Sequence, residues 1–325
     1  MRRRAFNALF AIAFTTPRLV LAQERGKLAR IGYLGLAPAA GYAPCVDALR
    51  AGLHDLGYIE GRNLSFEFRW AETPQQLPKL ASELVSAGVD VIFTPSSMEA
   101  GAALETTKTV PVIFGAHADP VGVGHVGSLS RPGGNATGMT MLLTDLVAKE
   151  LEALKEALPN ARRFGVLFAS SAPSHVPALE AAERAARRLD VELRHAPVRN
   201  DDELRDAIPQ LAQDGVDGFM VFATPLTFLA RGPIAELAIR HRLPSVFGTK
   251  DNVVAGGLMS YAPDAAALTR RAAVFVDRVL KGEKPADLPV EQATRYELTI
   301  NLKTAQALGL TIPPTLLARA DEVVE

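Results

Sequence analysis

Polar and aromatic side chains collect in six loops of this 325-residue chain, each following an apolar run with the character of a buried strand. The loops are residues 37–42, 94–97, 115–119, 170–175, 223–228 and 248–252. Their hydroxyl, imidazole and carboxylate groups can hydrogen-bond to a small polar molecule. In open α/β sheets, ligands bind beyond the carboxyl ends of the strands. We therefore predict as ligand-binding residues Tyr42, Thr94, Ser96, Ser97, His117, Asp119, Ser170, Ser171, Thr224, Phe228 and Asp251.

The run from Thr94 to Ser97 leads into a predicted helix, and Ser96 and Glu99 have the spacing of a capping box. Free backbone N–H groups and the dipole at a helix start favour an anionic group, such as a ligand carboxylate. Helix capping alone is the alternative role for these residues. Ser170 and Ser171 hold the equivalent place in the second half of the chain.

His117 and Asp119 directly follow the predicted strand 110–114. A neutral imidazole and a carboxylate can both hydrogen-bond to a polar ligand, and Asp119 could pair with a ligand ammonium group. Alternatively, Asp119 and Pro120 begin the next helix, with aspartate as the N-cap and proline as the first helical residue.

Asp251 fits a loop cap and a ligand clamp equally well. Tyr42 and Phe228 can form the apolar wall that small-molecule sites need. Phe114 and Phe222 lie within or at the end of predicted buried strands, so core packing is the expected role for both.

No catalytic, metal-binding or cofactor-binding motif of the sequence indicates an enzyme. The sequence has no G-x-S-x-G, P-loop or H-E-x-x-H motif, and no two of its six histidines are three or four residues apart. Residues 122–127 match G-x-G-x-x-G, but they follow the fourth predicted strand instead of turning from the first strand into a helix. Cys45 is the single cysteine, which excludes an internal disulfide and a cysteine-rich zinc site. We predict no catalytic residue, no metal and no cofactor.

The composition is that of an ordinary globular protein, with 48% hydrophobic and 22% charged residues. Lys and Arg total 35 and Asp and Glu total 36, a formal net charge of −1. Because no basic excess exists to neutralise phosphates, we predict no nucleic-acid partner.

One order of elements occurs twice along the chain. Buried strands are predicted at residues 31–36, 64–70, 89–93 and 110–114, and again at 164–168, 191–195, 218–222 and 243–247. Helices are predicted between them, at about residues 46–56, 75–87, 176–189 and 201–213. Strands that alternate with helices form parallel sheets covered on both faces. The predicted fold is α/β, with two doubly wound parallel-sheet lobes.

The C-terminal part is too short to form a domain of its own. Strands at 256–261 and 296–301 and a helix at 265–280 are expected to complete the sheets of the two lobes. The predicted lobe I is therefore 28–137 plus 262–290, and lobe II is 138–261 plus 291–325. Crossings near Gly138, Pro263 and Val290 would form a multi-strand hinge that closes about a ligand.

The N-terminal segment has the pattern of a secretory signal peptide. Arg2, Arg3 and Arg4 precede the mainly apolar run 5–14, and Val20-Leu21-Ala22 resembles a cleavage site. We predict a signal peptide at residues 1–22 and export to the periplasm. An amphipathic start or an uncleaved anchor is the alternative.

Several longer motifs resemble those of the bacterial ABC transporter substrate-binding protein family that includes the tryptophan-binding type. These motifs are Leu56–Asn63, Asp119–Gly122, Arg131–Gly138, Ala255–Tyr261, Lys284–Gln292, Ile300–Ala305 and Leu310–Glu325. The resemblance implies a type I periplasmic-binding-protein fold and capture of a small organic solute, such as an amino acid or an aromatic or carboxylic acid. It also implies delivery of that solute to an inner-membrane ABC permease with a separate ATPase.

One departure from this resemblance concerns the ligand. Amino-acid-binding members similar to the tryptophan type tend to carry Thr-Asp-Asn where this chain has Ala223-Thr224-Pro225-Leu226. The chain thus lacks an acidic partner for an α-ammonium group at that place. Two other functions stay open: an α/β enzyme acting in the same cleft, with His117, Asp119 and Asp251 as its candidates, and a ligand-sensing partner of a membrane receptor.

Overall fold

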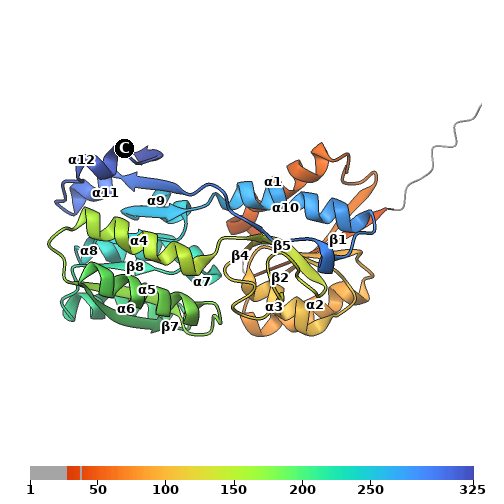
Figure 1. The fold of residues 1–325 in the computed structure, drawn as a ribbon, viewed down its shortest axis with the longest axis horizontal. Helices are drawn as coiled ribbons and strands as arrows, with labels where there is room; N and C mark the ends of the chain where they lie inside the picture. Colours follow the sequence, from red (N-terminus) through yellow and green to blue (C-terminus); the bar gives the residue numbers. More distant parts are fainter. Residues whose placement is uncertain (1–27, 37–38) are drawn as a thin grey trace, which may run out of the picture.

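The computed structural model describes residues 28–36 and 39–325, which form two α/β lobes lying side by side (Figure 1). The predicted signal peptide at residues 1–22 lies outside these described residues. Within them, no helix has the length and apolar character needed to cross a bilayer.

Lobe I is built on a six-stranded, wholly parallel sheet in the order β11-β5-β4-β3-β1-β2. Its strands are β1 (Ala29–Leu36), β2 (Leu64–Ala71), β3 (Val91–Thr94), β4 (Val112–His117), β5 (Ala136–Thr140) and β11 (Glu291–Gln292). Its helices are η1 (Ala39–Tyr42), α1 (Ala43–Asp55), η2 (Pro74–Gln76), α2 (Leu77–Ser86), α3 (Ser97–Thr106), α10 (Ala265–Leu280) and η3 (Pro285–Asp287). Figure 1 shows α1 and α10 on one face of this sheet and α2 and α3 on the other.

Lobe II is built on a seven-stranded sheet in the order β13-β12-β10-β9-β8-β6-β7, in which only the β10–β12 pair is antiparallel. Its strands are β6 (Arg163–Ala169), β7 (Glu192–Val198), β8 (Gly218–Val221), β9 (Ser245–Phe247), β10 (Met259–Ala262), β12 (Glu297–Asn301) and β13 (Glu322–Val324). Its helices are α4 (Leu143–Ala157), α5 (His175–Leu189), α6 (Asp201–Gln213), α7 (Pro225–Leu229), α8 (Arg231–Arg240), α9 (Lys250–Val254), α11 (Leu302–Ala307) and α12 (Pro314–Leu317).

The sequence explains why these sheets are covered on both faces. The central strand β3 reads Val-Ile-Phe-Thr, and all four of its residues are buried, as parallel sheets between helices require. In lobe I, Tyr33 and Phe93 pack with α1 and α10, while Leu34 and Phe114 pack with α2 and α3. The predicted doubly wound α/β fold with two lobes is therefore confirmed.

In the described residues, three connections join the lobes: after β5, after β10, and between β11 and β12. The connections contact one another. The Tyr296 hydroxyl donates a hydrogen bond to the Met141 carbonyl over 3.1 Å, and the Tyr296 ring stacks on Tyr261 with the centroids 5.9 Å apart. The third connection is thus bonded to the first and packs against β10 just before the second connection begins.

Two of the predicted crossings were placed too early. Gly138 lies inside β5, and β11 continues lobe I to Gln292, so the boundaries predicted at 137–138 and 290–291 are wrong. Gly138, near which a crossing was predicted, is a strand residue in register with Phe114. Neither α4 nor β5 was predicted from the sequence.

Candidate functional site

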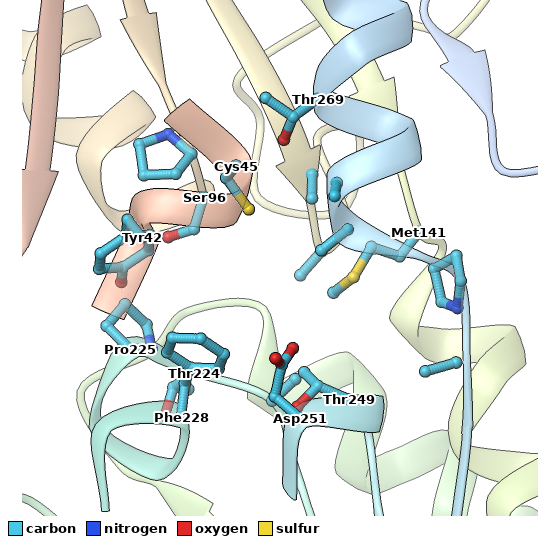
Figure 2. A pocket seen from close by; sticks show the side chains of 18 of the residues that line it. Tyr42, Cys45, Ser96, Met141, Thr224, Pro225, Phe228, Thr249, Asp251 and Thr269 are labelled. Atoms are coloured by element: carbon cyan, nitrogen blue, oxygen red, sulfur yellow. The ribbon is translucent and has the colours of Figure 1, made fainter. Parts of the chain in front are cut away.

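A cavity of about 310 Å³ lies between the two lobes, as the strand-end argument predicts (Figure 2). Lobe I contributes the starts of α1, α3 and α10, and lobe II contributes α7 and α9. Met141 of the first connection and Glu297 at the end of the third also line it. The cavity thus has walls from both lobes and from the hinge.

Tyr42 and Phe228 bring the two lobes into direct contact at one side of the cavity. Their ring centroids are 5.7 Å apart, with Tyr42 on lobe I and Phe228 on α7 of lobe II. A Cβ added to Gly41 would lie 3.2 Å from a methyl carbon of Leu229, so only glycine fits this approach without a shift. Tyr42 also contacts Trp70, whose ring centroid is 5.8 Å away. The predicted aromatic wall is thus present, and it spans the lobe boundary.

Asp251 is the charged group of the cavity that the fold leaves without a partner. It is exposed in the first turn of α9, and Figure 2 shows its carboxylate directed into the open space. Among the described residues its carboxylate has no hydrogen bond or ion pair, although its backbone carbonyl accepts from Ala255 N. Its neighbours are engaged: the Thr249 hydroxyl donates to Asn252 Oδ1 over 2.5 Å, and Lys250 pairs with Glu322. A ligand cation would give Asp251 its counter-charge.

The field of Asp251 reaches the opposite wall of the cavity. Burial is the main cause that raises the pKa of the Cys45 thiol, and a hydrogen bond with Thr269 partly opposes it. The negative charges of Asp251 and Asp264 raise this pKa further. Asp264 is itself the N-cap of α10, where its carboxylate accepts hydrogen bonds from Ala266 N and Ala267 N. The thiol therefore stays protonated, and the negative potential favours a cationic group in the cavity.

Ser96 and Ser97 line the cavity, but their hydroxyls are already bonded within the protein. Ser96 caps α3 by accepting from Met98 N, and its hydroxyl donates to the carboxyl of Glu99, so the capping-box residues do meet. Ser97 Oγ accepts from Ala118 N over 2.8 Å. The donors that this helix start still offers to an anion are backbone N–H groups of its first turn.

Thr224 lines the cavity as the N-cap of α7. Its hydroxyl accepts from Thr227 N over 3.2 Å, and Thr227 Oγ1 accepts from Thr224 N over 3.0 Å, which completes a capping box. The sequence had placed Thr224 only in a strand-end loop. The wall at this place therefore offers apolar surface, from Ala223 and Pro225, more than free hydroxyls.

Thr94 and His117, two predicted ligand-binding residues, do not line the cavity. Both are strand residues whose side chains point into lobe I, where they are fully buried. The His117 ring is bonded on both nitrogens, to Ser97 Oγ over 3.1 Å and to His125 Nδ1 over 2.8 Å. Burial, and then the neighbouring His125, lower the pKa of His117 well below its ordinary value. His117 is a neutral supporting residue behind the cavity wall.

Asp119 does not reach the cavity and does not start a helix. Its Oδ1 accepts a hydrogen bond from Gly122 N over 2.8 Å, which closes a turn. A Cβ on Gly122 would lie 2.2 Å from Asp119 Oδ2, so a side chain at this position would displace the Asp119 carboxylate. The motif Asp119–Gly122 is therefore a structural turn, and the helix alternative is also wrong.

Ser170 and Ser171 are exposed outside the cavity, because the loop after β6 continues to Ser174 before α5 begins. Ala172 and Ser174 hold the cavity wall instead. Ser170 borders a separate hollow on lobe II beside His195.

Several lining residues were missing from the predicted set: Cys45, Met141, Thr249, Lys250, Thr269 and Glu297. Cys45 and Thr269 come from α1 and α10, which were predicted as helices, but no pattern indicated that their first turns face the other lobe. Met141 belongs to the first connection, whose start was not located, and Glu297 begins β12, which was predicted as a strand without a place in the site.

Comparison with known proteins defines the class. Residues 40–324 match the model of the family described as ABC transporter substrate binding protein, and the chain belongs to this family. A relative named tyrosine-binding protein, from Clostridioides difficile, is 28% identical over 272 residues, which cover 82% of this chain and 78% of the relative.

Two solved structures are similar over nearly the whole described chain. One is a conserved domain protein from Vibrio cholerae, with a TM-score of 0.87 and 28% identity, covering 91% of this chain and all of that one. The other is an ABC domain from Streptococcus pneumonia in complex with L-Trp, with a TM-score of 0.84 and 26% identity, covering 91% and 99% of the two chains.

Proposed function

We propose that this protein is the periplasmic solute-binding component of an ABC importer, which captures an amino acid with an aromatic side chain and delivers it to a membrane permease. The observation that carries the ligand class is the Asp251 carboxylate, directed without a partner into a cavity whose wall includes Tyr42 and Phe228. An ammonium group would pair with Asp251, and the aromatic side chain would lie against the aromatic wall.

The relatives support this ligand class. One bears the name tyrosine-binding protein, and a similar structure holds L-Trp. The acid that tryptophan-type members tend to carry at the place of Thr224-Pro225 is absent here, and Asp251 on the neighbouring helix α9 supplies a carboxylate instead. The ligand carboxylate would lie at the start of α3, where backbone N–H groups and the helix dipole favour an anion.

Trp70 provides a direct readout of capture, because it is the only tryptophan of the chain and it contacts Tyr42 at the lobe boundary. Calorimetric titration with L-tyrosine, L-phenylalanine and L-tryptophan is expected to show saturable binding. For L-tyrosine and L-phenylalanine, Trp70 fluorescence is recorded as well, and its emission is expected to change when the lobes close. Mass spectrometry of the purified protein would identify a solute that is carried along. Absence of saturable binding to every amino acid would overturn the proposed ligand class.

Replacing Asp251 by asparagine is expected to weaken binding of the aromatic amino acid by about 10- to 100-fold, because a charge-assisted hydrogen bond is worth roughly 1.5–3 kcal/mol. Asparagine keeps the size of the side chain and removes the charge. The matched control is Asp206→Asn on the exposed side of α6, which should leave the dissociation constant unchanged.

A ligand without an ammonium group tests the proposed contact with Asp251 by a change in the ligand instead of the protein. For 3-phenylpropionate, the Asp251→Asn and wild-type proteins should bind with similar affinity, since the interaction that the substitution removes is missing from the ligand. An equal loss of affinity for both ligands would show that Asp251 does not pair with the ammonium.

A further inference from the structure

His117 holds together three segments that line the cavity, although its own side chain does not reach it. Its Nδ1 lies 3.1 Å from Ser97 Oγ, at the start of α3. Its carbonyl oxygen accepts from Met141 N over 2.9 Å and from the Thr140 hydroxyl over 2.9 Å, at the first connection between the lobes. Ser97 Oγ in turn accepts from Ala118 N.

The bonds of the His117 ring fix where its proton lies. Nδ1 accepts a hydrogen bond from the backbone N–H of Asp119 over 3.1 Å, so it carries no proton. The proton is therefore on Nε2, which donates to Nδ1 of His125 over 2.8 Å. His125 can accept this bond only while its Nδ1 is unprotonated.

We propose that His125 is a positioning residue for solute binding: it holds His117, and through it the Ser97, Ala118 and Met141 walls of the cavity, so that protonation of His125 weakens solute affinity. This inference rests on the proposed function. It differs from a role in ligand contact, because neither histidine lines the cavity.

The surroundings of His125 set the direction of the pH effect. Burial lowers the pKa of His125, while the charge of Glu105 on α3 opposes that shift. His117 on β4, which is neutral, faces His125 across their hydrogen bond, and Glu105 is the carboxylate whose charge acts on His125. His125 is partly exposed, so protons can reach it.

Protonated His125 would present an N–H to the N–H of buried His117, and one of the two rings would have to move. Because burial lowers the pKa of His125 below its ordinary value, the pair is intact at pH 8 and is lost only as the pH falls through that lowered pKa. Solute affinity is expected to fall measurably between pH 8 and pH 5.5, by at most about tenfold, since the pKa of His125 lies below its ordinary value and one proton changes affinity by at most about tenfold per pH unit.

The test is calorimetry with one aromatic amino acid from pH 8 to pH 5.5 on wild type, His125→Gln and His125→Phe. Glutamine can accept from His117 Nε2 through its amide oxygen at every pH. His125→Gln is therefore expected to keep near wild-type affinity at pH 8 and to lose the pH dependence, whereas His125→Phe should bind more weakly throughout. The exposed His54, replaced by glutamine, serves as control and should keep the wild-type profile.

Two outcomes would overturn the proposal: a wild-type affinity that is constant over this pH range, or a His125→Gln protein that retains the wild-type decline. The second comparison uses the same ligand in both proteins, which removes any titration of the ligand itself. If wild type binds no amino acid at pH 8, the proposed function fails instead, so the two failures are distinguishable.

Discussion

Exchanging Glu150 for methionine should stabilise the protein strongly at alkaline pH, by about 4 kcal/mol more at pH 8.5 than at pH 4.5. Glu150 projects from α4 into the core of lobe II, where it is fully buried, and neither carboxyl oxygen has a hydrogen-bond partner among the described residues. Burial raises its pKa from 4.5 to about 8. Each unit of that shift corresponds to about 1.4 kcal/mol.

The sign follows from which state binds the proton. Between pH 4.5 and about 8, the folded protein keeps Glu150 protonated while the unfolded chain releases the proton, so folding becomes less favourable as the pH rises through this range. Methionine has similar length, no charge and no polar hydrogen-bond requirement, so its contribution is constant with pH.

Urea unfolding of the ligand-free protein at several pH values measures this effect. The difference between Glu150→Met and wild type isolates the Glu150 contribution from those of the buried histidines. One of these, His175, has its pKa lowered to about 4 by burial and therefore destabilises the fold on the acid side. Glu152→Met, on the partly exposed side of the same helix, should change the free energy of unfolding by less than about 0.5 kcal/mol at any pH. A pH-independent difference for Glu150→Met would contradict the prediction.

The apolar patterning of the chain was sufficient to predict the architecture, because parallel strands buried on both faces read as continuous apolar runs. The helix predicted at 265–280 agrees with α10 at both ends, where Asp264 caps its start and Gly282 adopts a positive φ of 99° beyond its end. The helix α4 was missed although Leu143, Val147 and Leu154 carry its helical spacing. β5 gave no signal of its own, since Ala-Thr-Gly-Met-Thr is neither strongly apolar nor alternating.

The sequence predicted the location of the candidate site more reliably than the side chains that line it. The strand-end rule located the cavity, and Tyr42, Ser96, Ser97, Thr224, Phe228 and Asp251 do line it. Thr94 and His117 do not, because the rule identifies where a strand ends but not which of its last residues points into the core. Ser170 and Ser171 do not either, because the length of a loop before its helix starts cannot be read from hydroxyl content.

Gly138 has a different role from the one that its place in the sequence predicted. A crossing between the lobes was expected near it. The structure instead places it where β5 passes β4 so closely that an added Cβ would lie 2.1 Å from the Phe114 carbonyl oxygen and 2.8 Å from the Phe114 nitrogen. Its φ of 144° lies in a region that residues with a side chain rarely adopt.

Replacing Gly138 by alanine is therefore expected to destabilise lobe I by more than about 4 kcal/mol, because backbone strain and a clash with another strand's backbone combine at one position. Strands β4 and β5 cannot move apart without breaking the parallel β4–β5 ladder. The hydrogen bond from Met141 N to the His117 carbonyl lies at the end of this ladder, at the hinge. Urea unfolding, or the soluble yield where the variant does not fold, measures the loss.

A glycine-to-alanine change elsewhere should have the opposite sign. Gly134 is exposed in the loop before β5, has no atom within 4 Å of an added Cβ and does not need a positive φ, so Gly134→Ala is expected to stabilise by about 0.4–1 kcal/mol by restricting the unfolded chain. If Gly138→Ala unfolds at the wild-type urea concentration while Gly134→Ala shows its gain, the close β4–β5 approach would be absent in solution. In that case the first connection would begin near Gly138 after all, and the hinge would be longer and looser than the packed Met141–Tyr296 contact implies.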